Sequence, residues 1–175
     1  MTKKGLVIVN TGDGKGKTTA ALGLAMRAWG SGLRVLILQF IKGQWKYGEL
    51  KAIEQLGKNI KIMQCGKGFT WAEKASADEH KKCAVETLEQ ARQEICSGNW
   101  DMIILDELNY AVRDGLIDES AVLELIDRKP EQLHLVITGR RAGKAVIDKA
   151  DLVTEMKLVK HHLDDGIEAQ AGIEF

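Results

Sequence analysis

This sequence has little of several features that mark particular classes of protein. Lys and Arg together number 25, and so do Asp and Glu, so no excess of positive charge favours nucleic acid as a partner. No apolar run is long enough to cross a membrane, and the first residues lead into a strand-like run rather than a signal peptide. The three cysteines, Cys65, Cys83 and Cys96, fit neither a disulfide framework nor a paired zinc motif. We therefore expect free thiols in a cytoplasmic protein that binds neither nucleic acid nor membrane.

The order of the apolar runs predicts the fold class. Strand-length apolar runs alternate with amphipathic helical patterns, which is typical of a parallel sheet covered by helices on both faces. The clearest helix is expected over 77–97, and another follows Asp118 as N-cap and stops before Pro130, the only proline. No repeat or linker interrupts the chain, so residues 1–175 are predicted to form a single domain. The predicted strands are 5–10, 34–40, 60–63, 101–106, 133–138 and 151–158.

A glycine-rich segment between the first strand and a helical run over 20–28 predicts a nucleotide site. It reads Thr-Gly-Asp-Gly-Lys-Gly-Lys-Thr-Thr, and its glycines allow successive N–H groups to face a phosphate at a helix N-terminus. Lys17 adds a positive charge, Thr18 offers the hydroxyl that binds magnesium in such loops, and Thr19 bonds a phosphate oxygen or caps the helix. Thr11 stands where the usual pattern has glycine. The predicted ATP-binding residues are Gly12, Asp13, Gly14, Lys15, Gly16, Lys17, Thr18 and Thr19.

Polar residues follow other strands at the edge of the sheet where ligands bind. An apolar strand ends in Asp106 and Glu107, which predicts a magnesium ligand in Asp106 and a contact of Glu107 with the metal shell, the ribose or an attacking group. The alternative is that the two carboxylates cap the next helix. Arg140 or Arg141 either reaches a phosphate or is a solvated loop arginine, and Lys42 is placed near the same rim. These features together predict an α/β, three-layer P-loop NTPase fold of the RecA-like type, with about six mainly parallel strands.

Phe69 and Trp71 lie on a glycine-rich loop in a chain that is only 5% aromatic. Burial of an aromatic side chain is worth several kcal/mol, so a ligand with a broad apolar face could use them. The alternative is that both fold back into the core. The four histidines, His80, His134, His161 and His162, show no metal-ligand spacing.

The motifs together resemble the ATP:corrinoid adenosyltransferases that make adenosylcobalamin. The resemblance covers nearly the whole chain and is most specific in the phosphate-binding loop and in Gly-Phe-Thr-Trp. The matching segments are residues 11–19, Gln-Phe-Ile-Lys-Gly at 39–43, Gly-Phe-Thr-Trp at 68–71, Leu-Asp-Glu-Leu-Asn at 105–109, Thr-Gly-Arg at 138–140 and Ala-Gln-Ala-Gly-Ile-Glu-Phe at 169–175.

The resemblance implies transfer of the 5′-deoxyadenosyl group of ATP to the Co(I) of a reduced corrinoid, with release of triphosphate and assistance from Mg²⁺. It implies that ATP lies in the loop in reversed sense, which is consistent with Thr11, so that Lys17 and Thr18 stabilise the triphosphate leaving group. Phe69 and Trp71 would press on the lower face of the corrin and exclude the axial ligand of cobalt. No protein nucleophile is implied, because Co(I) itself attacks C5′, and the sequence has no Ser-His or Cys-His arrangement.

The resemblance further implies a flavoprotein reductant that supplies electrons, and a homodimer. Some members of the family carry an extra N-terminal helix over the corrin, whereas this sequence begins almost directly at its first strand. Two other functions are compatible with the loop itself. One is a P-loop ATPase or phosphotransferase that cleaves the γ-phosphate, and the other is a nucleotide-binding regulatory or nucleic-acid motor module.

Overall fold

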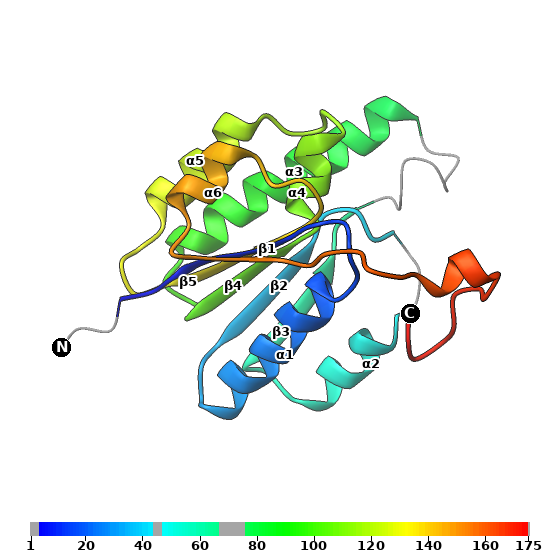
Figure 1. Ribbon diagram of the computed structural model, residues 1–175. Coiled ribbons are helices and arrows are strands. Elements are labelled where there is room, and N and C mark those ends of the chain that lie inside the picture. The colour runs from blue at the N-terminus through cyan, green and yellow to red at the C-terminus, as the bar shows by residue number, and fades with distance from the viewer. Residues whose placement is uncertain (1–3, 44–46, 67–75, 175) are drawn as a thin grey trace.

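The computed structural model describes residues 4–43, 47–66 and 76–174, and it has an α/β architecture. A parallel sheet of six strands, in the order β3-β2-β4-β5-β1-β6, lies between two layers of helices (Figure 1). The strands are β1 (Val7–Thr11), β2 (Val35–Gln39), β3 (Ile60–Gln64), β4 (Met102–Asp106), β5 (His134–Thr138) and β6 (Leu152–Glu155). The helices are α1 (Lys17–Gly30), α2 (Gly48–Gln55), α3 (Ala77–Cys96), α4 (Leu108–Arg113), α5 (Glu119–Arg128) and α6 (Lys144–Lys149), with a 3₁₀ turn at His162–Asp165. The predicted fold class is confirmed.

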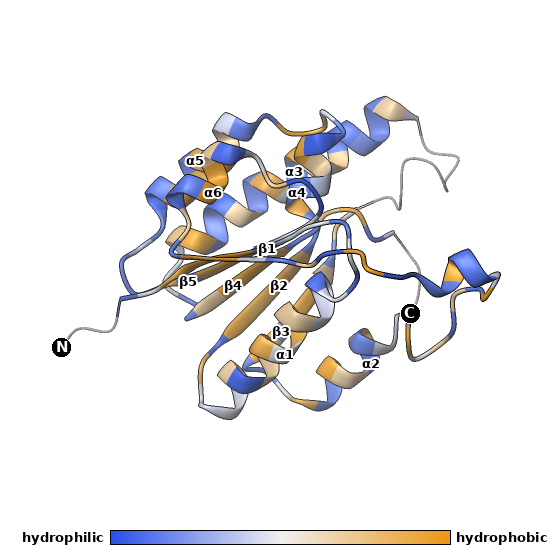
Figure 2. Ribbon diagram, viewed as in Figure 1, coloured by the Kyte–Doolittle hydropathy of each residue, from blue (hydrophilic) through white to orange (hydrophobic). Residues whose placement is uncertain are grey.

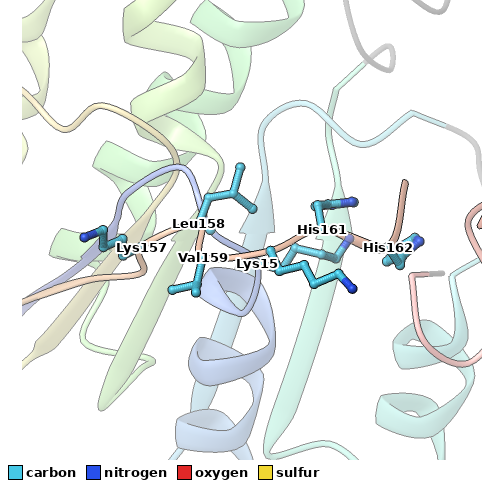
Figure 3. A pocket seen from close by; sticks show the side chains of 8 residues that line it. Lys15, Lys157, Leu158, Val159, His161 and His162 are labelled. Atoms are coloured by element: carbon cyan, nitrogen blue, oxygen red, sulfur yellow. The ribbon is translucent and has the colours of Figure 1, made fainter. Parts of the chain in front are cut away.

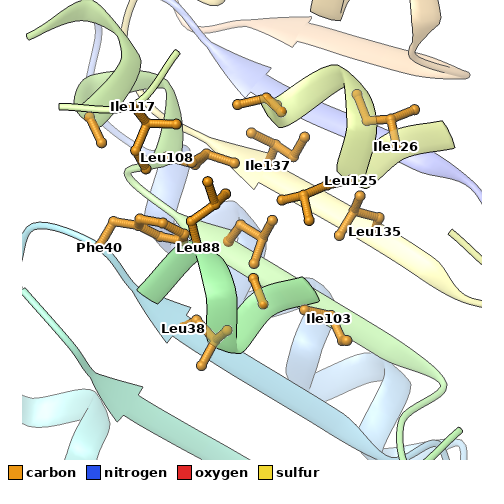
Figure 4. Packing of buried hydrophobic residues seen from close by; sticks show 14 of the residues in the cluster. Leu38, Phe40, Leu88, Ile103, Leu108, Ile117, Leu125, Ile126, Leu135 and Ile137 are labelled. Atoms are coloured by element: carbon orange, nitrogen blue, oxygen red, sulfur yellow. The ribbon is translucent and has the colours of Figure 1, made fainter. Parts of the chain in front are cut away.

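The central strands are apolar on both faces because both faces are covered. All five residues of β1, β2 and β4 are buried, and alternate side chains go to opposite layers. One layer packs α3, α4, α5 and α6 on residues such as Leu38, Ile103 and Leu135 (Figure 4). The other packs α1 and α2 on residues such as Ile37 and Ile104. Each such side chain contributes roughly 1.5–3 kcal/mol on burial, so the sheet is the rigid part of the molecule.

The helices show their apolar stripes toward the sheet and their polar residues toward solvent (Figure 2). In α3 the stripe is Ala84, Leu88, Ala91 and Ile95, and Ser76 with Glu79 forms a capping box at its start. Helix α5 begins after Asp118 as predicted, although the Asp118 side chain makes no capping hydrogen bond.

The sixth strand is shorter than the predicted 151–158. It forms an edge of the sheet against β1 and ends at Glu155. Met156 N–H still donates to the Thr11 carbonyl at 2.8 Å, but the chain then leaves the sheet and passes over the glycine-rich loop. The apolar residue Leu158, at which the predicted strand ended, is exposed. The other predicted strands are confirmed with bounds that differ by one or two residues.

The strand order brings the predicted site together. Strand β5 lies between β1, which leads into the glycine-rich loop, and β4, which ends in Asp106. All six strands are parallel, so the loops after β1, β4 and β5 meet at one edge of the sheet. The three cysteines are free thiols, as predicted. Within the described ranges, no helix is long and apolar enough to cross a membrane.

Candidate active site

The glycine-rich loop wraps around the ammonium group of Lys17. Gly16 precedes α1 with φ of 108°, a left-handed conformation that glycine adopts at little cost. Lys17 is the first residue of the helix, and its Nζ donates to the carbonyl oxygens of Gly12 at 2.8 Å and Gly14 at 2.6 Å. Burial lowers the pKa of this ammonium, and nearby Glu107 partly opposes that effect. The loop thus fixes a single positive charge at the N-terminus of α1.

Thr11 ties the loop to the segment after β5. Its side chain is buried, and its hydroxyl oxygen accepts a hydrogen bond from Ala142 N–H at 3.0 Å. Glycine, which usually stands at this position, has no side chain to make this bond. The departure from the usual pattern therefore has a structural consequence here, because the bond joins the loops after β1 and β5.

Asp106 is the centre of the hydrogen-bond network and is fully buried. One carboxylate oxygen, Oδ1, accepts from the hydroxyls of Thr18 and Thr138, both at 2.8 Å. The other, Oδ2, accepts from Gln39 Nε2 at 3.2 Å. A buried carboxylate is costly unless such partners satisfy it. The network therefore holds the start of α1 and the ends of β2, β4 and β5 in one arrangement.

Glu107 lies beside Asp106 in a left-handed conformation with φ of 61°, which is unusual for a residue other than glycine. Its N–H donates to the Thr138 hydroxyl oxygen at 2.9 Å, and its Oε2 atom is buried with no hydrogen-bond partner among the described residues. Burial, reinforced by the charge of Asp106, raises the pKa of Glu107 to about 7. The strained backbone and the unsatisfied carboxyl oxygen together indicate that Glu107 contacts a ligand.

Lys42 and Arg140 lie on two sides of this centre. Lys42 Nζ pairs with Glu49 at 2.8 Å and lies over the Tyr47 ring at 4.1 Å from its centroid. Arg140 is exposed in the segment after β5, and its charge acts on Lys15, Lys17 and Glu107. Arg140 is thus near the loop and Glu107, whereas Lys42 is near Glu107 and already has an anionic partner.

The C-terminal segment contacts the loop at Gly14 and Lys15. Gly14 N–H donates to the Met156 carbonyl at 2.7 Å, and Lys15 Nζ pairs with the carboxylate of Glu174. A side chain in place of Gly14 would bring its Cβ to 2.7 Å from backbone oxygens of Met156 and Lys157. Glycine at this position therefore also serves the approach of the C-terminal segment, and not the loop conformation alone.

The site suits a magnesium ion that is bound together with phosphate oxygens. Within residues 4–43, 47–66 and 76–174, no group of three or more His, Cys, Asp or Glu side chains could hold a metal by itself. Mg²⁺ does not need such a group, since it usually binds one or two carboxylates, water and substrate phosphates. The unpartnered Oε2 of Glu107 and Oε1 of Gln39 are both buried near Asp106 and supply oxygen atoms of the kind this ion prefers. The donor set therefore fits the ion.

The network contains two residues that the sequence-based prediction did not assign to the site, Gln39 and Thr138. Each is a polar residue at the last position of an apolar strand, the same signal that identified Asp106. The predicted corrin contacts, Phe69 and Trp71, lie outside the described residues. Asp13 and Thr19 belong to the loop and to α1, with Asp13 exposed and its charge acting on Lys17.

A glycine-rich loop that holds a lysine at a helix N-terminus, with its threonine bonded to a strand-end aspartate, defines a P-loop nucleotide-binding protein. The family model described as ATP:corrinoid adenosyltransferase BtuR/CobO/CobP matches residues 3–175. The chain belongs to this family.

Curated relatives match almost the whole of this chain. The chain is 42% identical over 175 residues to a corrinoid adenosyltransferase of Sinorhizobium sp., covering 99% of this chain and 81% of that protein. It is 38% identical to the corrinoid adenosyltransferase of Escherichia coli K12 over 173 residues, covering 99% and 87%. It is 37% identical to the corrinoid adenosyltransferase CobA of Salmonella typhimurium LT2, with the same coverage. The resemblance inferred from the motifs is confirmed.

Proposed function

We propose that this protein transfers the 5′-deoxyadenosyl group of ATP to the Co(I) centre of a corrinoid and releases triphosphate. Membership of the family carries this proposal, because the loop and Asp106 alone would also suit cleavage of a γ-phosphate. In the transfer, the electron pair of Co(I) forms the Co–C5′ bond while the C5′–O bond breaks. The pair from that bond leaves with the triphosphate, and cobalt becomes formally Co(III).

The described residues support stabilisation of the leaving group. Lys17 is held by two loop carbonyls beside the N-terminus of α1, where negative charge is also favoured by the helix dipole. The loop residues from Gly12 to Thr19, with Arg140 and Lys42 nearby, are proposed to bind the triphosphate. Because Lys17 is held in place by Gly12 and Gly14 before ATP binds, it needs little reorganisation as charge develops on the leaving oxygen.

Thr18 and Asp106 are proposed to hold Mg²⁺, Asp106 through water, with Glu107 in its outer shell or against the ribose. The ion would supply charge neutralisation along the triphosphate. The chain itself supplies positioning, which alone can account for roughly 7–11 kcal/mol of a barrier. Cobalt is the nucleophile, so this proposal assigns no nucleophilic side chain.

The remaining parts of the proposal rest on the family resemblance. Phe69 and Trp71 are proposed to contact the lower face of the corrin and to exclude the axial ligand of cobalt. A flavoprotein is proposed to deliver electrons, and a homodimer in the cytoplasm is the proposed working form.

The function is tested by mixing purified protein with ATP, Mg²⁺ and chemically reduced cob(I)alamin without oxygen. Loss of the Co(I) spectrum, a light-sensitive cobalt–carbon product and intact triphosphate would be expected. Steady release of orthophosphate with no consumption of corrinoid would contradict the proposal and favour an ordinary ATPase.

The corrin contact is tested with Trp71→Ala. We expect a larger loss of turnover when the assay starts from Co(II) with a reductant than when it starts from Co(I), because only the first requires loss of the axial ligand. Lys58→Ala, a substitution at an exposed position that leaves all four tryptophans in place, serves as a control. Equal losses in the two assays would count against the ligand-excluding role.

A further inference from the structure

A cavity of about 270 Å³ lies between the glycine-rich loop and the segment that follows β6 (Figure 3). It is smaller than the roughly 300–1,000 Å³ of pockets that hold whole ligands, so it suits one part of a ligand. Five of its eight lining residues are Lys or His, and none is acidic. The lining residues are Gly14, Lys15, Lys157, Leu158, Val159, Lys160, His161 and His162.

The carboxylate of Glu174 joins two of these side chains. Its Oε2 pairs with Lys15 Nζ, and its Oε1 lies 3.0 Å from His162 Nε2. The Glu174 side chain is only 12% exposed, so it is held largely away from water. In Figure 3, Lys15 extends toward His161 and His162, whereas Lys157 lies at the other end of the cavity. An anionic group from the C-terminal segment is therefore already bound between a loop lysine and a histidine.

Both ring nitrogens of His162 face oxygen acceptors. Its Nδ1 lies 2.6 Å from the carbonyl oxygen of Ile167, and its Nε2 faces the Glu174 carboxylate. Both neighbours are acceptors, so only the doubly protonated ring donates to each of them. Lys160, which also lines the cavity, pairs with Asp165 at 2.8 Å. Lys15 and His162 are thus the pair that shares a single anion.

We propose that Lys15 and His162 form an anion subsite for the terminal phosphate group of the triphosphate chain, and that Glu174 occupies this subsite until the nucleotide displaces it. This inference rests on the proposed function, in which the loop binds ATP. Lys15 belongs to that loop, so a phosphate chain bound along the loop reaches the subsite. A phosphate group carries more charge than a carboxylate and has three acceptor oxygens, so it outcompetes Glu174 for the same two donors.

The test compares binding of inorganic triphosphate and of AMP by calorimetry, with no corrinoid present. Glu174→Gln keeps the shape of the side chain and removes its charge, so it should bind triphosphate roughly two- to fivefold more tightly, the range of a partly exposed ion pair. AMP, which lacks the terminal phosphate, should bind as it does to the unchanged protein. Glu168→Gln, at an exposed position in the same segment, is the matched control and should change neither affinity.

His162→Gln gives an independent measurement. It should weaken triphosphate binding by a similar factor, and in the double variant the gain from Glu174→Gln should shrink because one of the two freed donors is gone. Unchanged or weaker triphosphate binding by Glu174→Gln would overturn the proposal. Tighter AMP binding without a change for triphosphate would also overturn it, and would place the nucleoside in the cavity. Neither result depends on adenosylation, so failure here is distinct from failure of the proposed function.

Discussion

The two sides of the nucleotide site are built in different ways. On the β4 side, the fully buried Asp106 receives hydrogen bonds from three side chains that stand on the sheet or on α1. On the C-terminal side, Glu174 reaches Lys15 and His162 from a segment in which most residues are exposed. The first arrangement can change only if strands move, whereas the second can change by movement of one surface segment. The comparison teaches that the groups around Asp106, which we call the fixed side, are held by strand ends and α1. The contacts of the C-terminal segment with the loop, which we call the exchangeable side, are held by a surface segment.

The largest effect is expected from Lys17→Ala, which removes the ammonium group that the glycine-rich loop holds at the start of α1. Loss of one such charge-stabilising group typically lowers turnover by about 10²–10³-fold, and we expect at least this loss with chemically generated Co(I). Lys58→Ala, an exposed lysine before β3, should keep full activity. Normal adenosylation by Lys17→Ala would show that the fixed side does not stabilise the leaving group.

The next effect concerns Glu107 and the pH dependence of stability. Its pKa is raised from 4.5 to about 7 in the folded protein. Between these values the folded protein holds a proton that the unfolded chain has released, so the free energy of unfolding should fall as pH rises through this range. The full penalty, up to about 3 kcal/mol, is present above pH 7.

Glu107→Gln should remove that penalty, so without nucleotide it should be more stable than the unchanged protein at pH 8 and similar to it at pH 4.5. Urea unfolding at the two pH values measures the difference. Glu168→Gln should leave the pH dependence as it was. A parallel pH dependence in Glu107→Gln and the unchanged protein would mean that another group is responsible.

A smaller effect is expected for Thr138→Val, which keeps the shape of the side chain but removes the hydroxyl between Asp106 and the N–H of Glu107. Unsatisfied buried partners cost about 1–3 kcal/mol, so we expect a loss of about 2 kcal/mol in the free energy of unfolding and lower turnover. The control is Thr87→Val, which removes a buried hydroxyl that donates to the Cys83 carbonyl within α3 and also bonds the Cys65 side chain, away from Asp106. Unchanged turnover in Thr138→Val would show that the hydrogen-bond network around Asp106 does not contribute to catalysis.

The smallest effect is expected on the exchangeable side, from Gly14→Ala. The added Cβ would collide with the backbone of Met156 and Lys157, and we expect the C-terminal segment to move away at a cost of about 1 kcal/mol. Gly23→Ala in α1 meets open space and should instead stabilise the protein by about 0.5–1 kcal/mol. Limited proteolysis should cut the C-terminal segment faster in Gly14→Ala. Unchanged proteolysis would show that the segment is held by other contacts.

The sequence predicted the fold because its apolar runs reach strand length and alternate with helical patterns. It predicted the loop because the glycines, Lys17 and Thr18 belong to a motif of fixed spacing, and it predicted Asp106 because two carboxylates end an apolar strand. It did not predict the roles of Gln39 and Thr138, since a single uncharged polar residue at a strand end gains meaning only when the strand order is known. Nor did it predict the Glu174 contact, which joins residues 159 positions apart through charges that look like ordinary surface charges. Strand β6 is shorter than predicted because the chain leaves the sheet after Glu155 and its Met156 carbonyl accepts a hydrogen bond from Gly14 in the loop. A contact between such distant segments leaves no local sequence pattern.

The contact between Glu174 and Lys15 also determines where a tag can be attached. A tag that follows Glu174 directly lies beside a residue that contacts the nucleotide loop. The start of β1, by contrast, lies at the opposite edge of the sheet (Figure 1). An affinity tag or fluorescent label placed before β1 should therefore leave ATP binding unchanged, while the same label after Glu174 would alter the quantity being measured.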